Sequence, residues 1–259
     1  MLRINNLKVS VEDKVILEGL DLSVDSGQIV FIMGKNGCGK STLAQALMGN
    51  PQYTASGSVI FKGQDLLEMS ISERSNNGLF VSFQHPVEIA GVNLMTYLKE
   101  IINTNRISNG LDKLKSREIL DLVKSNMKLL NWYESFLKRN LNEGMSGGEK
   151  KKCEILQMLC LNPDLVILDE IDSGLDVQAL ADICTVVVKS SFENRSQNID
   201  TNRSQSLIII THNPRILDFI IPNKVIVING GKVARIGDYT LAQDIFVNGF
   251  DKNINFDFV

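Results

Sequence analysis

The sequence predicts an α/β fold with a mostly parallel core sheet, an N-terminal antiparallel β subdomain and an inserted α-helical subdomain. Residues 2–33 read as short strands joined by tight turns, which is typical of antiparallel hairpins. Residues 85–145 show helical periodicity in their apolar side chains. After residue 146, helical patterns alternate with apolar runs of strand length, as in a parallel sheet covered by helices.

The composition is that of a single globular domain spanning residues 1–259. The chain is 44% hydrophobic and 22% charged. Its net charge of −3 lacks the positive excess that is typical of nucleic-acid-binding proteins. No apolar run approaches the roughly 18 to 20 residues that span a bilayer. We therefore expect neither a nucleic-acid partner nor direct membrane insertion.

The compartment is indicated by two further patterns. The N-terminal residues lack the pattern of a signal or transit peptide, and the four cysteines lack metal-binding or redox spacing. Both favour a reducing compartment. The sequence is rich in Asn, Lys and Ile, which suggests an AT-rich genome such as that of a plastid or a bacterium. We therefore expect the cytoplasm, or the plastid stroma if an organelle genome encodes the chain.

The first half of the α/β core lies in residues 1–84. Strands are predicted at Leu2–Val11 and Val15–Val24, separated by an acidic turn. Three more predicted strands follow, at Gln28–Met33, Ser58–Phe61 and Leu79–Phe83.

The helical subdomain, residues 85–145, separates this half of the core from residues 146–259. Its apolar side chains recur on one face of each of two predicted helices. They are Leu94, Leu98, Ile101 and Ile102 in the first helix, and Ile119, Leu122, Val123 and Met127 in the second.

The second half of the core is predicted as helix, strand, helix, strand and hairpin. These elements are expected at Glu149–Leu161, Leu165–Leu168, Val177–Lys189, Leu207–Ile210 and Val225–Ile236. Residues 190–206 are rich in Asn and Ser and have few apolar anchors, which predicts a flexible surface loop. A contact with a partner protein is the alternative for this segment.

A glycine-rich loop after the Gln28–Met33 strand matches the phosphate-binding pattern GxxxxGK[ST]. Its glycines let backbone N–H groups surround phosphate oxygens, and the following helix adds its positive N-terminal field. Lys40 is placed to reach the β- and γ-phosphates of ATP. Cys38 is most simply a small tolerated residue, with a redox-sensitive thiol as the alternative. The predicted nucleotide-binding residues are Gly34, Lys35, Asn36, Gly37, Cys38, Gly39, Lys40, Ser41 and Thr42.

Three other strand ends supply the groups that hydrolysis requires. Asp169 and Glu170 follow one apolar strand, and Gln84 and His212 follow two others. The carboxyl ends of parallel strands meet at one edge of a sheet, where ligands bind. We expect Ser41, Gln84 and Asp169 to hold Mg²⁺. Glu170 is the predicted general base, and His212 the predicted γ-phosphate sensor.

A second anion site is predicted at the start of a helix, in the turn formed by Ser146, Gly147 and Gly148. The phosphate loop already serves the chain's own nucleotide. We therefore expect this second site to meet ATP held by another copy, in a transient ATP-dependent homodimer. Asp176 is expected to couple the two sites. Lys151 and Lys152 are predicted to form a solvated face.

The phosphate loop, Gln84, SGGEK, VILDE, SGLD and His212 occur in the order found in ABC-type ATPases, which the chain resembles over nearly its whole length. This resemblance implies a P-loop ABC-ATPase fold and two ATP molecules held between head-to-tail subunits. The stretches VSFQHPVEIAGVNLMTYLK, SGGEKKKCEILQMLCLNPDLVILDEIDSGLD and THNPRILDFIIP are similar to those of the SufC family. These are the ATPases of SUF iron–sulfur cluster assembly.

The SufC resemblance also implies partners. SufB- and SufD-like scaffold proteins are expected to contact the segment from Gln84 to Asn93, and ATP-driven pairing is expected to deform them. One departure concerns Val11, which stands where many ABC ATPases place an aromatic ring against adenine. Without stacking, we expect weak ATP affinity and poor discrimination against GTP.

Two alternatives belong to other classes. The chain would be the ATPase subunit of an ABC membrane transporter if separate membrane-spanning subunits accompanied it. It would be an inactive interaction module if its catalytic residues were missing. The stretches SGGEKKK, IDSGLD and QHPVEIAGV favour iron–sulfur assembly over transport, and the intact Lys40, Asp169, Glu170 and His212 argue against an inactive module.

Overall fold

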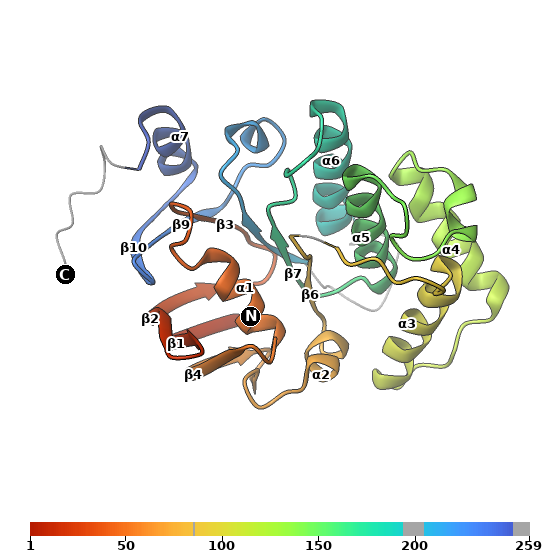
Figure 1. Cartoon of the computed structure of the whole chain (residues 1–259), viewed down its shortest axis with the longest axis horizontal. Coiled ribbons are helices and arrows are strands. Elements are labelled where there is room, and N and C mark those ends of the chain that lie inside the picture. Colours follow the sequence, from red (N-terminus) through yellow and green to blue (C-terminus); the bar gives the residue numbers. More distant parts are fainter. Residues whose placement is uncertain (85, 194–204, 251–259) are drawn as a thin grey trace.

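The computed structural model of the chain describes residues 1–84, 86–193 and 205–250, apart from the side chains of Phe192 and Glu193. These residues form two sheets, seven α-helices and two short 3₁₀ helices (Figure 1). The strands are β1 (Leu2–Val11), β2 (Lys14–Val24), β3 (Ile29–Met33), β4 (Tyr53–Phe61), β5 (Gln64–Asp65), β6 (Leu79–Val81), β7 (Leu165–Asp169), β8 (Ser206–Ile210), β9 (Lys224–Asn229) and β10 (Lys232–Gly237). The α-helices are α1 (Lys40–Met48), α2 (Ile71–Asn76), α3 (Leu94–Ser108), α4 (Ser116–Leu129), α5 (Gly147–Leu161), α6 (Val177–Glu193) and α7 (Tyr239–Asn248). The 3₁₀ helices are Glu134–Lys138 and Pro214–Asp218.

The core sheet is mostly parallel, as the sequence predicts. In the described part of the chain its strand order is β10-β9-β3-β8-β7-β6, and only the β9–β10 hairpin is antiparallel. All five residues of β3 and all five of β7 are buried. Continuous apolar runs of this kind are expected where helices or a second sheet cover both faces.

The N-terminal strands form the expected antiparallel sheet, in the order β2-β1-β4-β5. It packs with α1 against one face of the core sheet, where Val30 and Ile32 of β3 are buried among its side chains. Ile29, Phe31 and Met33 point to the opposite face, into the core shared with α5, α6 and α7. Alternate residues of one strand thus belong to two separate hydrophobic cores.

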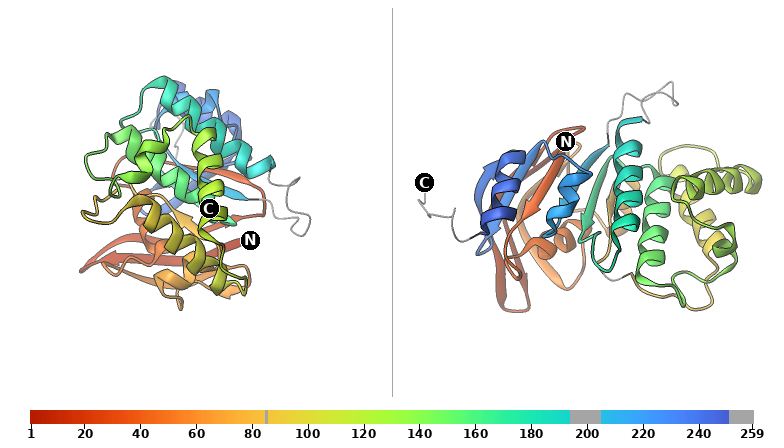
Figure 2. Two further views of the ribbon diagram at one scale, coloured as in Figure 1. Left: turned by 90° about the vertical axis from the view of Figure 1, so that its right-hand side faces the viewer. Right: turned by 90° about the horizontal axis from the view of Figure 1, so that it is seen from above.

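The helical subdomain lies at one end of the molecule, beyond α5 (Figure 2). The apolar stripes predicted from the sequence bury Leu94 and Leu98 of α3 and Ile119 and Val123 of α4 against α5. Because α5 belongs to this helical layer and also packs on α6, it joins the subdomain to the core.

Several element boundaries differ from the sequence prediction. β4 begins at Tyr53, because its N-terminal half pairs with β1 even though its burial is low. β6 ends at Val81, so Gln84 lies in an irregular loop. The predicted loop 190–206 is shorter at both ends, since α6 continues to Glu193 and β8 begins at Ser206. Residues 194–204 lie outside the described residues.

Candidate functional site

The phosphate loop connects β3 to α1, and close contacts require two of its glycines. A Cβ on Gly34 would stand 2.3 Å from the Ile228 carbonyl oxygen, and one on Gly39 would stand 2.5 Å from Leu17 Cδ2. Gly39 also has φ of 107° at the N-cap of α1, a conformation that side chains disfavour. The loop therefore curls tightly over the N-terminus of α1.

Lys40 is buried inside this loop. Its Nζ donates hydrogen bonds to the carbonyl oxygens of Gly34 at 2.8 Å and Lys35 at 3.0 Å. Next in sequence, Ser41 Oγ donates to Asp169 Oδ1 at 3.2 Å, which joins the start of α1 to the end of β7. The predicted phosphate and metal ligands are thus adjacent.

Asp169 offers a free oxygen toward this junction. Its carboxylate is buried, and Oδ2 has no hydrogen-bond partner among the described residues. Burial raises the pKa of Asp169, against the lowering effect of the Ser41 hydrogen bond. Mg²⁺ prefers oxygen ligands such as carboxylates and hydroxyls, and a buried carboxylate oxygen without a partner is ready to accept a cation. The Asp169 and Ser41 oxygens therefore fit a bound Mg²⁺.

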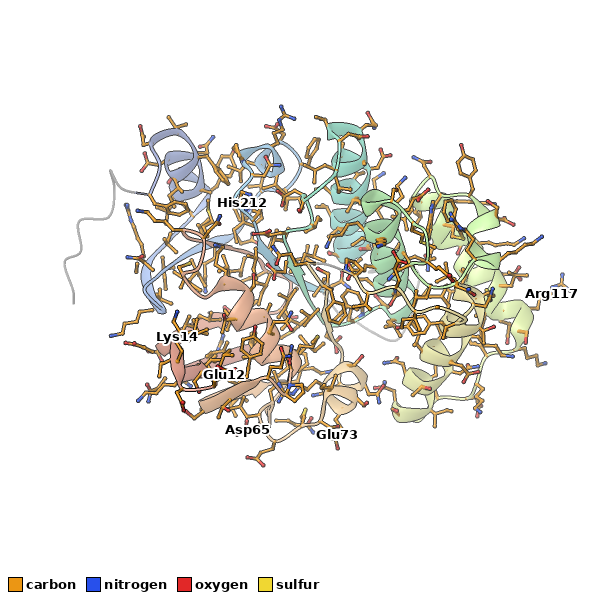
Figure 3. The ribbon with its side chains drawn as sticks, viewed as in Figure 1. Glu12, Lys14, Asp65, Glu73, Arg117 and His212 are labelled. Carbon is orange, nitrogen blue, oxygen red and sulfur yellow. The ribbon has the colours of Figure 1, made fainter. Side chains whose placement is uncertain are left out.

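Glu170 is held between two of the residues that the sequence singled out. Gln84 Nε2 donates to Glu170 Oε2 at 2.6 Å, and His212 Nδ1 lies 3.4 Å from Glu170 Oε1. His212 follows Thr211 at the end of β8, at the upper edge of the core in Figure 3. The backbone of Glu170 has φ of 49°, a strained conformation for a residue with a side chain. A carboxylate fixed in this way can accept a proton from a bound water.

The turn at Ser146 lies apart from the phosphate loop. Ser146 Oγ caps α5 by accepting from the Glu149 N–H, while Glu149 Oε2 accepts from the Ser146 N–H. Helix α5 packs on α3, α4 and α6, whereas α1 packs on β1, β2, β4, β6 and β7. Ser146 and Gly147 are exposed to solvent. The structure therefore does not bring this turn onto the chain's own phosphate loop.

Asp176 lies at the start of α6, where Oδ1 accepts from the Ala179 N–H at 2.8 Å. The acidic turn before it begins at Glu170, whose carbonyl oxygen accepts from the Ser173 N–H at 3.0 Å. A Cβ on Gly148 would stand 3.4 Å from Leu175 Cδ2, so this turn lies beside the Ser146 turn. Asp176 thus follows an acidic turn that begins at Glu170 and lies beside the Ser146 turn.

The structure corrects the prediction for Lys151. Its side chain is buried rather than solvated, because Nζ donates to the Phe83 carbonyl oxygen at 2.6 Å and pairs with Glu154 at 3.3 Å. Lys152 is partly exposed. The structure also disfavours a reactive Cys38, since burial raises the pKa of its thiol despite the nearby Lys40.

Other contributors carried no motif signal. Ser82 Oγ accepts from the Asp169 N–H at 3.1 Å and fixes the end of β7. Thr211 Oγ1 donates to Asp172 Oδ1 at 3.0 Å and joins the end of β8 to the acidic turn. Ser82 lies near the end of the predicted strand Leu79–Phe83 and Thr211 directly after the predicted strand Leu207–Ile210, and these positions were the only available sign.

Comparisons with known proteins agree with this geometry. Residues 17–173 match the ABC transporter family. The chain belongs to this family. It is 43% identical to the probable ATP-dependent transporter SufC of Escherichia coli over 251 residues, which cover 96% of this chain and 97% of that protein. It is 41% identical to the probable ATP-dependent transporter ycf16 of Cyanophora paradoxa, over 97% and 93% of the two chains. The resemblance to SufC is confirmed, and this ABC family member is an ATPase.

The ABC fold is also confirmed by solved structures. The dimeric post-hydrolysis ATP-binding cassette MJ0796, bound to ADP and Pi, superimposes with a TM-score of 0.75 at 20% identity, over 92% of this chain and 99% of that one. The cassette MJ1267 superimposes with a TM-score of 0.73 at 23% identity, over 96% and 95%.

In residues 1–84, 86–193 and 205–250, no three His, Cys, Asp or Glu side chains gather as a metal-binding cluster. Within the same ranges, every helix is too short or too polar to span a bilayer.

Proposed function

We propose that this ATPase hydrolyses Mg²⁺-bound ATP in a transient head-to-tail homodimer and thereby changes the conformation of SufB- and SufD-like scaffold proteins during iron–sulfur cluster assembly. The observation that carries the proposal is the division of the site. The phosphate loop, Asp169 and Glu170 lie together, while the Ser146 turn is exposed at the start of α5, which packs on other elements. A second copy supplies the missing half of each site.

The residues divide the work as follows. Lys40 and the loop around it bind the phosphates, and Ser41, Asp169 and Gln84 hold Mg²⁺, which neutralises phosphate charge when bound. Glu170 takes the proton of the attacking water, and His212 contacts the γ-phosphate.

The other half of each site comes from the partner copy. Backbone N–H groups of Gly147 and Gly148, at the positive end of α5, face the partner's γ-phosphate together with Ser146. Asp176 couples contact with the partner copy to the position of Glu170 through the acidic turn.

The scaffold proteins are assigned to the loop after Gln84. Val87 is 70% exposed and Ile89 is 42% exposed, although both are apolar. A cavity of about 500 Å³ opens between α2 and α3; its lining includes Tyr97, Ile101 and Phe83, the residue before Gln84. Exposed apolar surface rimmed by polar residues is typical of protein–protein contacts.

The proposed compartment is the cytoplasm, or the plastid stroma for an organelle-encoded chain. The four cysteines are buried and unpaired, as in a reducing compartment.

Affinity capture of the tagged chain from its native cells, followed by mass spectrometry, tests the proposal. We expect SufB- and SufD-like proteins to be captured, and joint alanine substitution of Pro86, Val87 and Glu88 to lose them. Tyr133→Ala is the matched control, since Tyr133 is an exposed ring elsewhere in the helical subdomain. Capture of a membrane permease in place of the scaffold proteins would make the chain a transporter subunit.

A further inference from the structure

The loop that carries Gln84 is attached to α5 through the backbone of the preceding residue. The Phe83 N–H donates to Glu154 Oε1 at 2.7 Å, and the Phe83 carbonyl oxygen accepts from Lys151 Nζ at 2.6 Å. Lys151 Nζ also donates to Glu154 Oε2 at 3.3 Å. Both backbone groups of one loop residue are therefore bonded to one ion pair, which lies within one turn of α5.

This ion pair is buried. The side chains of Lys151 and Glu154 are each only 6% exposed. Removing two charges from water is costly, and apolar residues at such positions are often equally stable. Burial also raises the pKa of Glu154, against the lowering effect of Lys151. Stabilisation of the fold therefore explains this ion pair poorly. What the pair does specifically is fix the position of the Phe83 backbone.

The Phe83 side chain contributes little to this position, because it is 42% exposed. The residue before Phe83, Ser82, is fixed by its hydrogen bond with Asp169. The residue after Phe83, Gln84, reaches Glu170 with its side-chain amide. A shift of the Phe83 backbone therefore moves the Gln84 amide relative to the proposed base.

We propose that Lys151 and Glu154 are positioning residues that clamp Phe83, so that α5 sets the placement of Gln84 beside Glu170. The helix that begins with the Ser146 turn then carries Gln84 with it when it moves. Contact of that turn with a partner's nucleotide reaches the water-activating carboxylate through this clamp. The catalytic part rests on the proposed function of Glu170, whereas the clamp itself does not.

The test exchanges the two charges in the variant K151E/E154K. An ion pair remains in the same place, but a carboxylate at 151 cannot donate to the Phe83 carbonyl oxygen and an ammonium at 154 cannot accept from the Phe83 N–H. The matched control is K124E/E134K, which exchanges an exposed ion pair of the helical subdomain. If the first variant does not fold, K151M/E154L replaces the pair by apolar side chains of similar volume.

The first readout is hydrogen–deuterium exchange of the nucleotide-free chain. We expect the Phe83 amide to exchange about fivefold faster in K151E/E154K, as the loss of one hydrogen bond implies, and unchanged in K124E/E134K. Exchange unchanged in both variants overturns the clamp, whatever the function of the protein.

The second readout separates kcat from KM. We expect kcat for ATP to fall about tenfold or more, since misplacing a positioned group can cost up to about a hundredfold, while KM stays within about twofold. In the Gln84→Ala background, the exchange of charges is expected to lower kcat no further. A full second loss in that background contradicts action through Gln84. If Gln84→Ala itself keeps the wild-type kcat, the proposed catalytic role of Gln84 is contradicted. The hydrogen–deuterium exchange of the Phe83 amide then decides the clamp.

Discussion

Glu170 is the most constrained side chain of the site. Gln84 and His212 contact its two carboxylate oxygens, and its backbone N–H and carbonyl oxygen are bonded to Ile210 and Ser173. Such restraint from several elements keeps the left-handed backbone at this position and fixes the direction of the carboxylate.

Replacing Glu170 by Gln keeps the shape of this side chain and removes its ability to take a proton. We expect ATP turnover to fall by about 10² to 10⁴, the range of general acid–base catalysis. ATP binding should stay the same, because phosphate binding does not use this group. Phosphate release assays and equilibrium titration with ATP check both parts. An intact turnover rate would remove Glu170 from the role of base.

Val11 ends β1, and we expect it to stand where many ABC ATPases stack an aromatic ring on adenine. We expect Val11→Tyr to tighten ATP binding about fivefold, the equivalent of about 1 kcal/mol of stacking, and to increase the preference for ATP over GTP. Titration with both nucleotides measures this. Val15→Tyr on β2 is the control, and an equal effect of both changes would show that the gain is not specific to Val11.

At the residue scale, the sequence predicted the meeting of the polar side chains that belong to motifs, and it predicted the wrong environment for Lys151. Gln84, Asp169, Glu170 and His212 follow strands, so their meeting at one sheet edge was predictable. Lys151 stands in a run of three lysines, which is typical of a solvated face. Its burial depends on the backbone of Phe83, more than sixty residues away, and no local pattern records such a partner.

Among the elements, the phosphate loop requires glycine at some positions and tolerates a Cβ at another. Gly34 has no room for a Cβ beside the Ile228 carbonyl oxygen, while a Cβ on Gly37 would meet nothing within 4 Å. We expect Gly34→Ala to lose ATP binding and to lower the melting temperature. Gly37→Ala should cost only about 1 kcal/mol of backbone strain. Calorimetry and ATP titration compare them, and equal losses would contradict the close-approach argument.

Helices α5 and α6 bury three of the four thiols. Burial raises the pKa of Cys153 and Cys184 to about 12 and that of Cys160 to about 11. These thiols therefore stay protonated at pH 8, and only the thiolate reacts quickly. We expect iodoacetamide to leave all three unmodified in the folded chain and to alkylate them in denaturant. Rapid alkylation in the folded chain would show that α5 and α6 open readily.

At the element scale, strands with continuous apolar runs were predicted with small errors at their ends, because burial on both faces leaves a clear pattern. The N-terminal half of β4 was missed, since it pairs with β1 at a largely exposed edge. Helix α2 was also missed, although Ser70 and Glu73 form a capping box at its start.

In the whole molecule, the phosphate loop precedes α1, which packs on strands of both sheets, and the Ser146 turn precedes α5, which packs on α3, α4 and α6. The core holds the phosphate loop and the proposed base, whereas the Ser146 turn before α5 is exposed to solvent. The proposal that a second copy joins these two parts came from the sequence, because two predicted anion sites in one chain are one more than a single nucleotide needs.

The most direct test of the central claim is sedimentation velocity of the Glu170→Gln variant with saturating Mg²⁺-ATP. We expect a dimer with ATP and a monomer with ADP, since each γ-phosphate would bridge two copies. Adding Gly148→Asp should restore the monomer while ATP still binds, because the new carboxylate would face the partner's γ-phosphate. A variant that binds ATP and stays monomeric at saturation would contradict the composite site.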